Sequence, residues 1–226
     1  MSQQITATRL KCEYFENPLG IDAHSPRFSF VPLQEGRNRR QSAYRIVVGT
    51  MHDIVAIGEG DMWDSGFVRS KACANIVYDG EPLKSGTRYY FSVQLKDADG
   101  EKGPISEVSC FETGLLQPGD WQGCFIGMPA QGPAQLLRRE FTLDKPVAWA
   151  RAYVAGLGYY ELHINGSRIG DRVMEPGFTD YTKRVFYSVY DVTSNLVQGE
   201  NCIGACVGSG WYKHPSLLLQ LNIRYT

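Results

Sequence analysis

The sequence has almost no excess of either charge, because 23 lysine and arginine residues stand against 24 aspartate and glutamate residues. A chain without a net field does not gather phosphate backbones or an anionic bilayer. It also lacks any apolar run near the ~20 residues that a membrane span requires. Residues 1–20 lack the basic start and apolar core of a signal peptide. We therefore expect no nucleic-acid or membrane partner, and a cytoplasmic location, or a periplasmic or secreted one if a leader was removed.

No cysteine or histidine pattern indicates a disulfide framework or a metal site. The six cysteines are Cys12, Cys73, Cys110, Cys124, Cys202 and Cys206, and the four histidines are His24, His52, His163 and His214. None of the cysteines forms a Cys-x-x-Cys pair, and Cys202 and Cys206 would lie about 13 Å apart on an extended strand. No histidine has a His or Cys partner at ligand spacing. We expect small apolar thiols packed in sheets, and neither a metal nor a cofactor.

The segment Asp97-Ala-Asp-Gly100 has the look of half a calcium loop. A complete EF-hand loop would need a bidentate glutamate at its twelfth position, and Val108 stands there. A plain hairpin turn is therefore the better interpretation.

Short apolar-alternating segments separated by turn residues fill the first half of the chain. The segments predicted as strands are Ala43–Gly49, Tyr89–Leu95 and Val108–Thr113, and Trp63-Asp64 is predicted as a strand that enters a turn. No helix-length periodic segment interrupts them, which is typical of an immunoglobulin-like or fibronectin type III sandwich. Gly114–Asp120 carries two glycines and a proline and breaks the pattern. We place the domain boundary there, with domains at 1–115 and 116–226.

The second half again contains strands joined by loops of uneven length. Strands are predicted at Cys124–Ile126, Leu136–Phe141, Ala148–Ala155, Tyr159–Ile164, Arg184–Asp191, Asn201–Val207 and Leu217–Tyr225. Asn165-Gly166 supplies the two positive-φ positions of a tight hairpin, so Ser167–Val173 should fold back antiparallel. This number of strands fits a jelly roll. The fold class is thus all-β, with two β-sandwich domains.

Aromatic residues are the strongest functional signal. Phe178, Tyr181, Trp211 and Tyr212 fall in connections rich in glycine and proline, where no strand obliges them to face a core. A flat ring stacks on the apolar face of a pyranose, while a neighbouring carboxylate such as Asp180 binds its hydroxyls. We therefore predict carbohydrate binding by Asp180, Tyr181, Trp211 and Tyr212. The alternative is that these rings fill the ends of the sandwich or a domain interface.

A catalytic site is much less evident in the sequence. Glycoside hydrolysis needs two carboxyl groups, roughly 6.5 to 9.5 Å apart for inversion and about 5 Å for retention. Asp171, Glu175 and Asp180 share one loop region and are the only cluster worth inspecting. His163 lies on the polar phase of its strand beside Glu161, which is typical of a solvated residue. We predict no catalytic residue in this chain.

Ordered motifs along the chain resemble the N-terminal region of bacterial alpha-L-rhamnosidases. In the first half they are Glu13-Tyr-Phe-Glu-Asn-Pro-Leu-Gly-Ile-Asp, Pro26-Arg-Phe-Ser-Phe, Gln41-Ser-Ala-Tyr-Arg-Ile, Trp63-Asp-Ser-Gly and Phe111-Glu-Thr-Gly-Leu-Leu followed by Asp120-Trp. In the second half they are Ala155-Gly-Leu-Gly-Tyr-Tyr-Glu-Leu, Ile164-Asn-Gly, Pro176-Gly-Phe-Thr-Asp-Tyr, Tyr190-Asp-Val-Thr and Gly208-Ser-Gly-Trp-Tyr-Lys. The resemblance implies a fibronectin-like module followed by the N-terminal jelly roll of that family. One departure is the short His214-Pro-Ser loop, where the family usually carries a longer one.

The resemblance also implies where the chemistry occurs. In that family, inverting hydrolysis takes place in a separate (α/α) barrel whose acidic residues lie in a run resembling Asp-x-x-x-Arg-x-Glu-Arg, and this sequence contains no such run. The chain should therefore be an accessory region that is inactive alone, and its partner would be the catalytic barrel. Three interpretations stay open. These are a structural and substrate-positioning front end, an independent module that binds rhamnose-containing glycans, and protein adhesion through the first domain.

Overall fold

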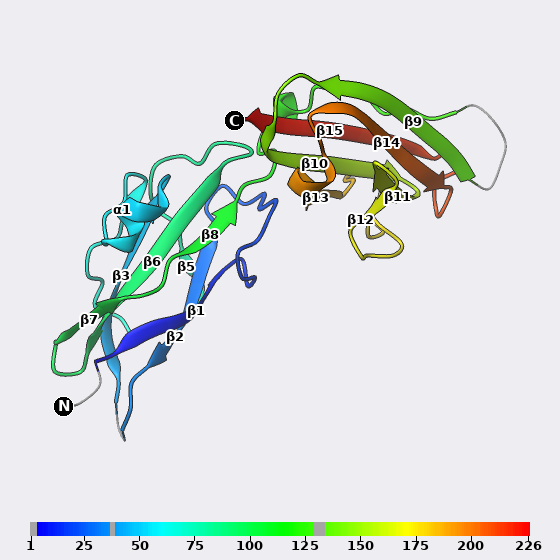
Figure 1. Cartoon of the computed structure of the whole chain (residues 1–226). Coiled ribbons are helices and arrows are strands. Elements are labelled where there is room, and N and C mark those ends of the chain that lie inside the picture. Colours follow the sequence, from blue (N-terminus) through cyan, green and yellow to red (C-terminus); the bar gives the residue numbers. More distant parts are fainter. Residues whose placement is uncertain (1–3, 37–38, 129–133) are drawn as a thin grey trace. The chain divides into compact units, whose positions relative to one another are not determined.

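The computed structural model describes residues 4–36, 39–128 and 134–226, which form two compact units, Met1–Asp120 and Trp121–Thr226 (Figure 1). Each unit contains two sheets whose inward faces share one apolar core. The predicted all-β class with two β-sandwich domains is confirmed. Among the described residues, no helix is both long enough and apolar enough to cross a membrane.

The first unit contains two antiparallel sheets. One sheet has the order β1-β2-β5, formed by β1 (Thr6–Cys12), β2 (Arg27–Leu33) and β5 (Ile76–Val77). The other has the order β4-β3-β6-β7, formed by β4 (Trp63–Asp64), β3 (Gln41–Gly49), β6 (Arg88–Asp97) and β7 (Lys102–Ile105), and β8 (Ser109–Glu112) also pairs with β6. Phe28 from the first sheet meets Phe91 and Phe111 from the second, with ring centroids 4.6 and 5.7 Å away. These aromatic contacts close the sandwich.

The strands predicted for this unit are confirmed as β3, β4, β6 and β8. The predicted turn at Asp97–Gly100 is also confirmed, since the Gly100 amide donates to the Asp97 carbonyl at 3.0 Å and β6 pairs with β7. Two short helical segments, α1 (His52–Ala56) and the 3₁₀ turn η1 (Pro118–Asp120), were not predicted. Both are shorter than the window in which a helical period can be recognised.

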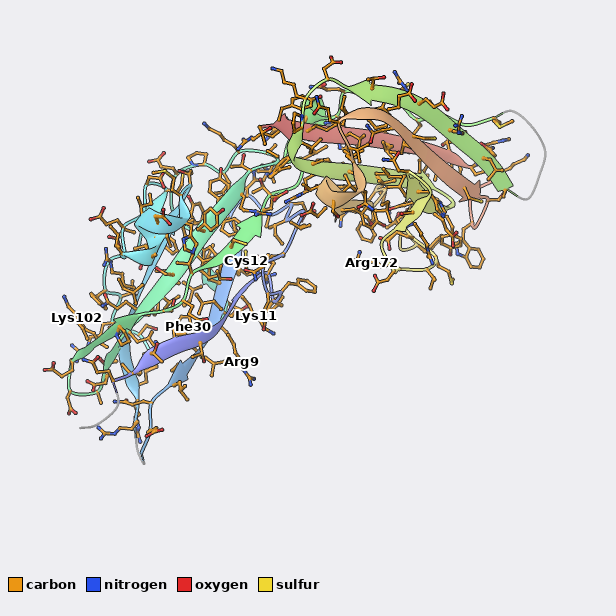
Figure 2. All side chains as sticks on the ribbon, viewed as in Figure 1. Arg9, Lys11, Cys12, Phe30, Lys102 and Arg172 are labelled. Atoms are coloured by element: carbon orange, nitrogen blue, oxygen red, sulfur yellow. The ribbon has the colours of Figure 1, made fainter. Side chains whose placement is uncertain are left out.

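Strand β1 contains a bulge that changes which of its side chains face the core. Its pairing with β2 shifts register between Thr8 and Lys11, and Arg9 between them has φ +50°. Ile5 and Ala7 are buried before the bulge, and Leu10 and Cys12 are buried after it. The extra residue moves the inward phase from odd to even positions. Figure 2 labels Cys12 and Phe30 in this sheet.

A two-pronged ion pair fastens the end of β1 to β2. Arg27 donates from Nε to Glu13 Oε1 at 3.1 Å and from Nη2 to Oε2 at 2.6 Å, and the Arg27 amide donates to Oε1 at 2.6 Å. The Arg27 guanidinium also lies 4.9 Å from the centre of the Tyr14 ring. These hydrogen bonds from Arg27 hold the pKa of the Glu13 carboxyl below its usual range.

This pair makes the stability of the first unit depend on acid pH. Because the pKa of Glu13 is lower in the folded chain than in the unfolded one, its contribution is present above the unfolded pKa and is lost as the pH falls through the folded pKa. We expect Glu13→Gln to lower the free energy of unfolding by about 1 kcal/mol at neutral pH, with this difference shrinking in acid. Urea unfolding at several pH values measures it. The exposed Glu16→Gln is the control, and a difference that grows toward acid pH would contradict the assignment.

The second unit also contains two antiparallel sheets. One has the order β13-β10-β15, formed by β13 (Tyr187–Asp191), β10 (Val147–Leu157) and β15 (Ser216–Tyr225). The other has the order β12-β11-β14-β9, formed by β12 (Ser167–Ile169), β11 (Tyr159–Ile164), β14 (Gly199–Gly208) and β9 (Ala134–Leu143). A short 3₁₀ turn, η2 (Thr193–Asn195), follows β13. Alternate residues of these strands build the core.

The predicted hairpin after β11 is confirmed, although its return strand is shorter than expected. Asn165 and Gly166 have φ of +51° and +82°, as a tight hairpin of this kind requires. Strand β12 ends at Ile169, and the chain then leaves the sheet instead of continuing to Val173. The predicted strand Arg184–Asp191 likewise begins only at Tyr187.

The predicted strand Cys124–Ile126 is wrong. Only Ile126 pairs with β15, through two hydrogen bonds with Leu217 of 2.9 and 2.8 Å. The two glycines that flank the segment explain this, because they add no side chain to either sheet and weaken a strand. The expectation of packed cysteines fails here too, since Cys124 is exposed in this connection. Cys12, Cys110, Cys202 and Cys206 do lie in strands, and Cys73 lies in a connection.

The assignment of inner and outer faces in the β12-β11-β14-β9 sheet can be tested with two of its leucines. Leu162 on β11 is 1% exposed in the core, whereas Leu136 on β9 is 78% exposed on the outer face. We expect Leu162→Ala to lower the free energy of unfolding by about 2 to 5 kcal/mol, because it leaves a cavity. Leu136→Ala should change it by less than about 0.5 kcal/mol. Equal losses in denaturant titrations of the two variants would show that the faces are assigned incorrectly.

Candidate carbohydrate-binding site

Four aromatic side chains from two connections of the second unit form one cluster. The connection between β12 and β13 supplies Phe178 and Tyr181, and the connection between β14 and β15 supplies Trp211 and Tyr212. The Phe178 ring centre lies 5.9 Å from that of Tyr181 and 6.0 Å from that of Trp211. The Tyr181 and Tyr212 ring centres lie 5.3 Å apart. The structure thus brings together the three aromatic residues predicted for the site and adds Phe178; we call these four the ring cluster.

The position of Trp211 is set by β11. Its indole Nε1 donates to the Tyr159 hydroxyl at 2.7 Å. Gly210, with φ +52°, lies against the Tyr159 ring so closely that a Cβ there would be 2.8 Å from a ring carbon. The Tyr212 amide closes this turn by donating to the Ser209 carbonyl at 2.8 Å. Only glycine lets the turn approach the Tyr159 ring and carry Trp211 over it.

Asp180 organises the turn that precedes Tyr181. Its carboxylate accepts from the Thr182 amide at 3.1 Å and from the Thr182 hydroxyl at 2.6 Å, and Lys183 Nζ lies 3.4 Å away. The Thr182 hydroxyl, the amide and the lysine together lower the pKa of the Asp180 carboxyl. Asp180 is therefore an anion held beside the ring cluster, and its side chain stays about half exposed.

Burial differs sharply within the ring cluster. Phe178 and Trp211 are 66% and 70% exposed, whereas Tyr181 is partly buried. The Tyr181 hydroxyl is buried and has no hydrogen-bond partner in the described part of the chain. A buried hydroxyl without a partner costs about 1 to 3 kcal/mol. The ring cluster therefore exposes two aromatic rings and contains one buried polar group without a partner in the described residues.

Exposed apolar residues continue from Phe178 along the same connection. The exposed surface that we call the apolar patch comprises Val173, Met174, Phe178, Phe186 and Trp211. Sequence reasoning missed Val173, Met174 and Phe186, because it had assigned Val173 to a return strand and Phe186 to β13. Arg172 and Lys183 supply charge along this connection, and Figure 2 shows Arg172 on the loop that follows β12. Of these side chains, Phe178 and Trp211 contact each other, and exposed apolar surface of this kind is typical of an interaction site.

The candidate acidic residues have separate local roles. Glu175 receives a hydrogen bond from the Ser188 hydroxyl and lies 3.4 Å from Arg172, while its carbonyl accepts from the Tyr160 amide at 2.9 Å. Asp180 is held in its own turn, and Asp171 is exposed. These contacts explain the positions of Glu175 and Asp180 without a catalytic role.

Among the described residues, neither a cluster of metal-ligating side chains nor His163 is part of the ring cluster. Within residues 4–36, 39–128 and 134–226, no group of three or more His, Cys, Asp or Glu side chains is arranged to hold a metal ion. His163 pairs across the sheet with Arg168 and Gly204, on positions that alternate with the buried Leu162 and Ile164. Its predicted outward orientation is confirmed.

Both halves of the chain match described protein families. Residues 7–117 match the Rha78A-like N-terminal immunoglobulin domain, and residues 145–224 match the alpha-L-rhamnosidase N-terminal domain. A curated alpha-L-rhamnosidase from Formosa agariphila is 37% identical over 238 aligned residues, which cover 93% of this chain and 26% of that protein. The chain thus spans about a quarter of the length of this relative.

Solved structures give the same result. The alpha-L-rhamnosidase from Dictyoglumus thermophilum superposes with a TM-score of 0.89 at 37% identity, over 97% of this chain and 27% of that one. The enzyme from Streptomyces avermitilis superposes with a TM-score of 0.88 over 98% of this chain and 39% of that one, and at 23% identity this likeness supports the fold. The chain consists of an N-terminal immunoglobulin-like domain and a rhamnosidase N-terminal domain, both of which occur in alpha-L-rhamnosidases. It therefore belongs to the alpha-L-rhamnosidase family, as an N-terminal part of such a protein.

Proposed function

We propose that this chain is a non-catalytic accessory region of an alpha-L-rhamnosidase and that its second unit docks against the catalytic part of the parent enzyme. The observation that carries the proposal is the apolar patch, in which several large side chains of one connection remain exposed. The relatives that match the whole chain are about four times longer, so their remaining length supplies a covalently linked partner. A catalytic (α/α) barrel is the partner that the family resemblance implies.

The geometry of the patch suits an intramolecular contact. Phe178 and Trp211 make an edge-on contact with each other, and Phe186 approaches Gly177 closely enough that a Cβ there would be 3.8 Å from its ring. Rings held by neighbouring rings lose little conformational entropy when a second surface covers them. Arg172, Lys183 and Asp180 lie on the same connection and supply charges of both signs, as the polar rims of interfaces commonly do.

The accessory role predicts that the chain alone does not hydrolyse rhamnosides. We expect no release of nitrophenol from 4-nitrophenyl α-L-rhamnopyranoside above the rate without protein, because the Glu175 and Asp180 carboxylates are held by local structural contacts. A chromogenic assay on the repurified chain measures this. Matched Asp171→Asn and Asp180→Asn variants identify any contaminating enzyme, since contaminating activity would survive both. Turnover that persists through repurification and disappears in either variant would overturn the accessory role.

A second candidate function is direct carbohydrate binding by the ring cluster. Two features favour sugar binding. The buried Tyr181 hydroxyl has no hydrogen-bond partner in the described residues, and the carboxylate of the adjacent residue, Asp180, is about half exposed. A sugar ring would stack on Trp211 or Phe178 and offer its hydroxyls to Asp180 and, after a shift of the groups that cover it, to the Tyr181 hydroxyl. Covering the rings contributes about 25 cal/mol for each Å² of apolar surface removed from water. Rhamnose-containing glycans are the ligand class that the family suggests.

This second function is tested by calorimetric titration with L-rhamnose. We expect Trp211→Ala to weaken binding by about tenfold or more, which corresponds to at least about 1.4 kcal/mol, because the exposed indole supplies most of the stacking surface. Phe15→Ala, which removes an exposed aromatic ring from the first unit, is the control and should bind as the wild type does. An equal affinity of wild type and Trp211→Ala would exclude the ring cluster as a rhamnose site and leave docking as its role.

A further inference from the structure

A cavity with the chemistry of a sugar site lies in the first unit. It has a volume of about 590 Å³, within the range of small-molecule sites in proteins. It opens between the edge strands β4 and β5, which belong to different sheets of the sandwich. The lining residues that matter are Tyr44, Trp63, Asp64, Asn75, Val77 and Asp79. We call it the edge cleft.

The path of the chain between β4 and β5 creates the edge cleft. After β4, Val68 exchanges hydrogen bonds of 2.8 and 3.1 Å with Tyr44 on β3. The chain then crosses to the other sheet, where the Cys73 carbonyl accepts from the Phe30 amide at 2.8 Å. Strands β4 and β5 are only two residues long, and the chain crosses from one sheet to the other in the segment that joins them. The two sheet edges therefore leave a space between them. The cleft is therefore fixed by backbone hydrogen bonds at both edges.

An indole ring held by the core contributes to the wall of the edge cleft. The Trp63 ring is stacked on Phe28 with centres 6.2 Å apart and planes 22° apart, and Tyr78 meets its edge at 5.4 Å. Trp63 is nevertheless only partly buried and lines the cavity. A ring that is rigid before a ligand arrives needs no ordering when the ligand stacks on it.

Polar groups around Trp63 are available for hydrogen bonds. Within the described residues, neither Trp63 Nε1 nor the Tyr44 hydroxyl makes a hydrogen bond, and neither atom is among the fully buried polar atoms without a partner. Asn75 uses its Oδ1 to accept from the Tyr14 hydroxyl at 2.8 Å, which leaves its amide hydrogens as donors. Asp79 is exposed and supplies a carboxylate acceptor. The rim thus offers both donors and acceptors beside an aromatic surface.

The charges around the edge cleft favour an uncharged ligand. Asp64 is neutralised by Arg45, whose Nε and Nη2 donate to its carboxylate at 2.8 and 2.6 Å. No lysine or arginine is among the described lining residues, so an anionic ligand would meet only the Asp79 charge. A quaternary ammonium group would suit the ring and the carboxylate, but it has no acceptors for the donors of Trp63, Tyr44 and Asn75. Hydroxyl groups satisfy donors and acceptors alike.

We propose that the edge cleft of the first unit binds a neutral pyranose ring of a glycan, which stacks on Trp63 and bonds to Tyr44, Asn75 and Asp79. This makes the immunoglobulin-like domain a ligand-binding module in addition to any spacer role. The proposal does not depend on the function of the second unit, because it uses a separate cavity and a separate tryptophan.

The test follows the indole N–H signals in two-dimensional ¹H–¹⁵N spectra of the full chain. The Trp63 signal is assigned by its loss in Trp63→Phe, which keeps a ring on Phe28, or by elimination with Trp121→Phe, Trp149→Phe and Trp211→Phe. The probes are methyl α-L-rhamnopyranoside, methyl α-D-glucopyranoside and methyl β-D-galactopyranoside, with tetramethylammonium chloride as the competing chemistry. We expect at least one pyranoside to shift the Trp63 signal saturably.

Two matched substitutions locate the binding. Ala74→Arg places a long side chain at the rim of the edge cleft, and Ala56→Arg places the same side chain on α1; both alanines are exposed, so both variants should fold. Ala74→Arg should weaken the pyranoside affinity read from the Trp63 signal by about tenfold or more, and Ala56→Arg should leave it unchanged. No saturable shift with any pyranoside, an equal response in Ala74→Arg, or a shift with tetramethylammonium alone would overturn the proposal.

Discussion

The packing of β10 against β11 is the interaction on which the second unit depends. Ala150, Ala152 and Val154 alternate along the inward face of β10, and Leu162 and Ile164 do the same on β11. Small residues on one sheet and larger ones on the other let the sheets approach closely. This alternation commits every second residue to the core. The Gly- and Pro-rich connections lie outside this alternation, so Phe178 and Trp211 of the ring cluster can remain exposed.

The sequence predicted the elements in which local chemistry and the two-residue period agree. Asn165-Gly166 specified its turn through the φ values that it tolerates, and the strand predicted at Leu217–Tyr225 is present as β15, with Leu219, Leu221 and Ile223 packed against the core. It failed where a bulge or a long-range pairing decides the outcome. Strand β1 was not predicted, because the bulge at Arg9 breaks the period in the middle of the strand. Ile126 pairs with Leu217, about 90 residues away, and no local pattern reveals how far that pairing extends.

The candidate site was predictable to a similar degree. The rings of Tyr181, Trp211 and Tyr212 stood out because no strand period placed them in a core, and the structure brings them together with Phe178. Whether they bind sugar stays a prediction. The bond from Trp211 to Tyr159 could not have been anticipated, because it joins a turn to an outward position of a strand 52 residues away. The edge cleft was invisible for the same reason, since it arises where two sheet edges meet.

The edge cleft and the ring cluster differ in how each tryptophan is ordered before a ligand binds. A flexible aromatic side chain loses entropy when it is fixed against a ligand, and this loss offsets part of the stacking energy. In the first unit, Trp63 is fixed by Phe28 and Tyr78, so its ring is ordered by the same core that folds the domain. In the second unit, Trp211 is fixed from outside the core, by a hydrogen bond to Tyr159 and a ring contact with Phe178. A site tied to the core should tolerate few changes in its domain, whereas one built on connections can vary while β10 and β11 remain packed. The second arrangement suits a surface that must fit a particular partner domain or glycan.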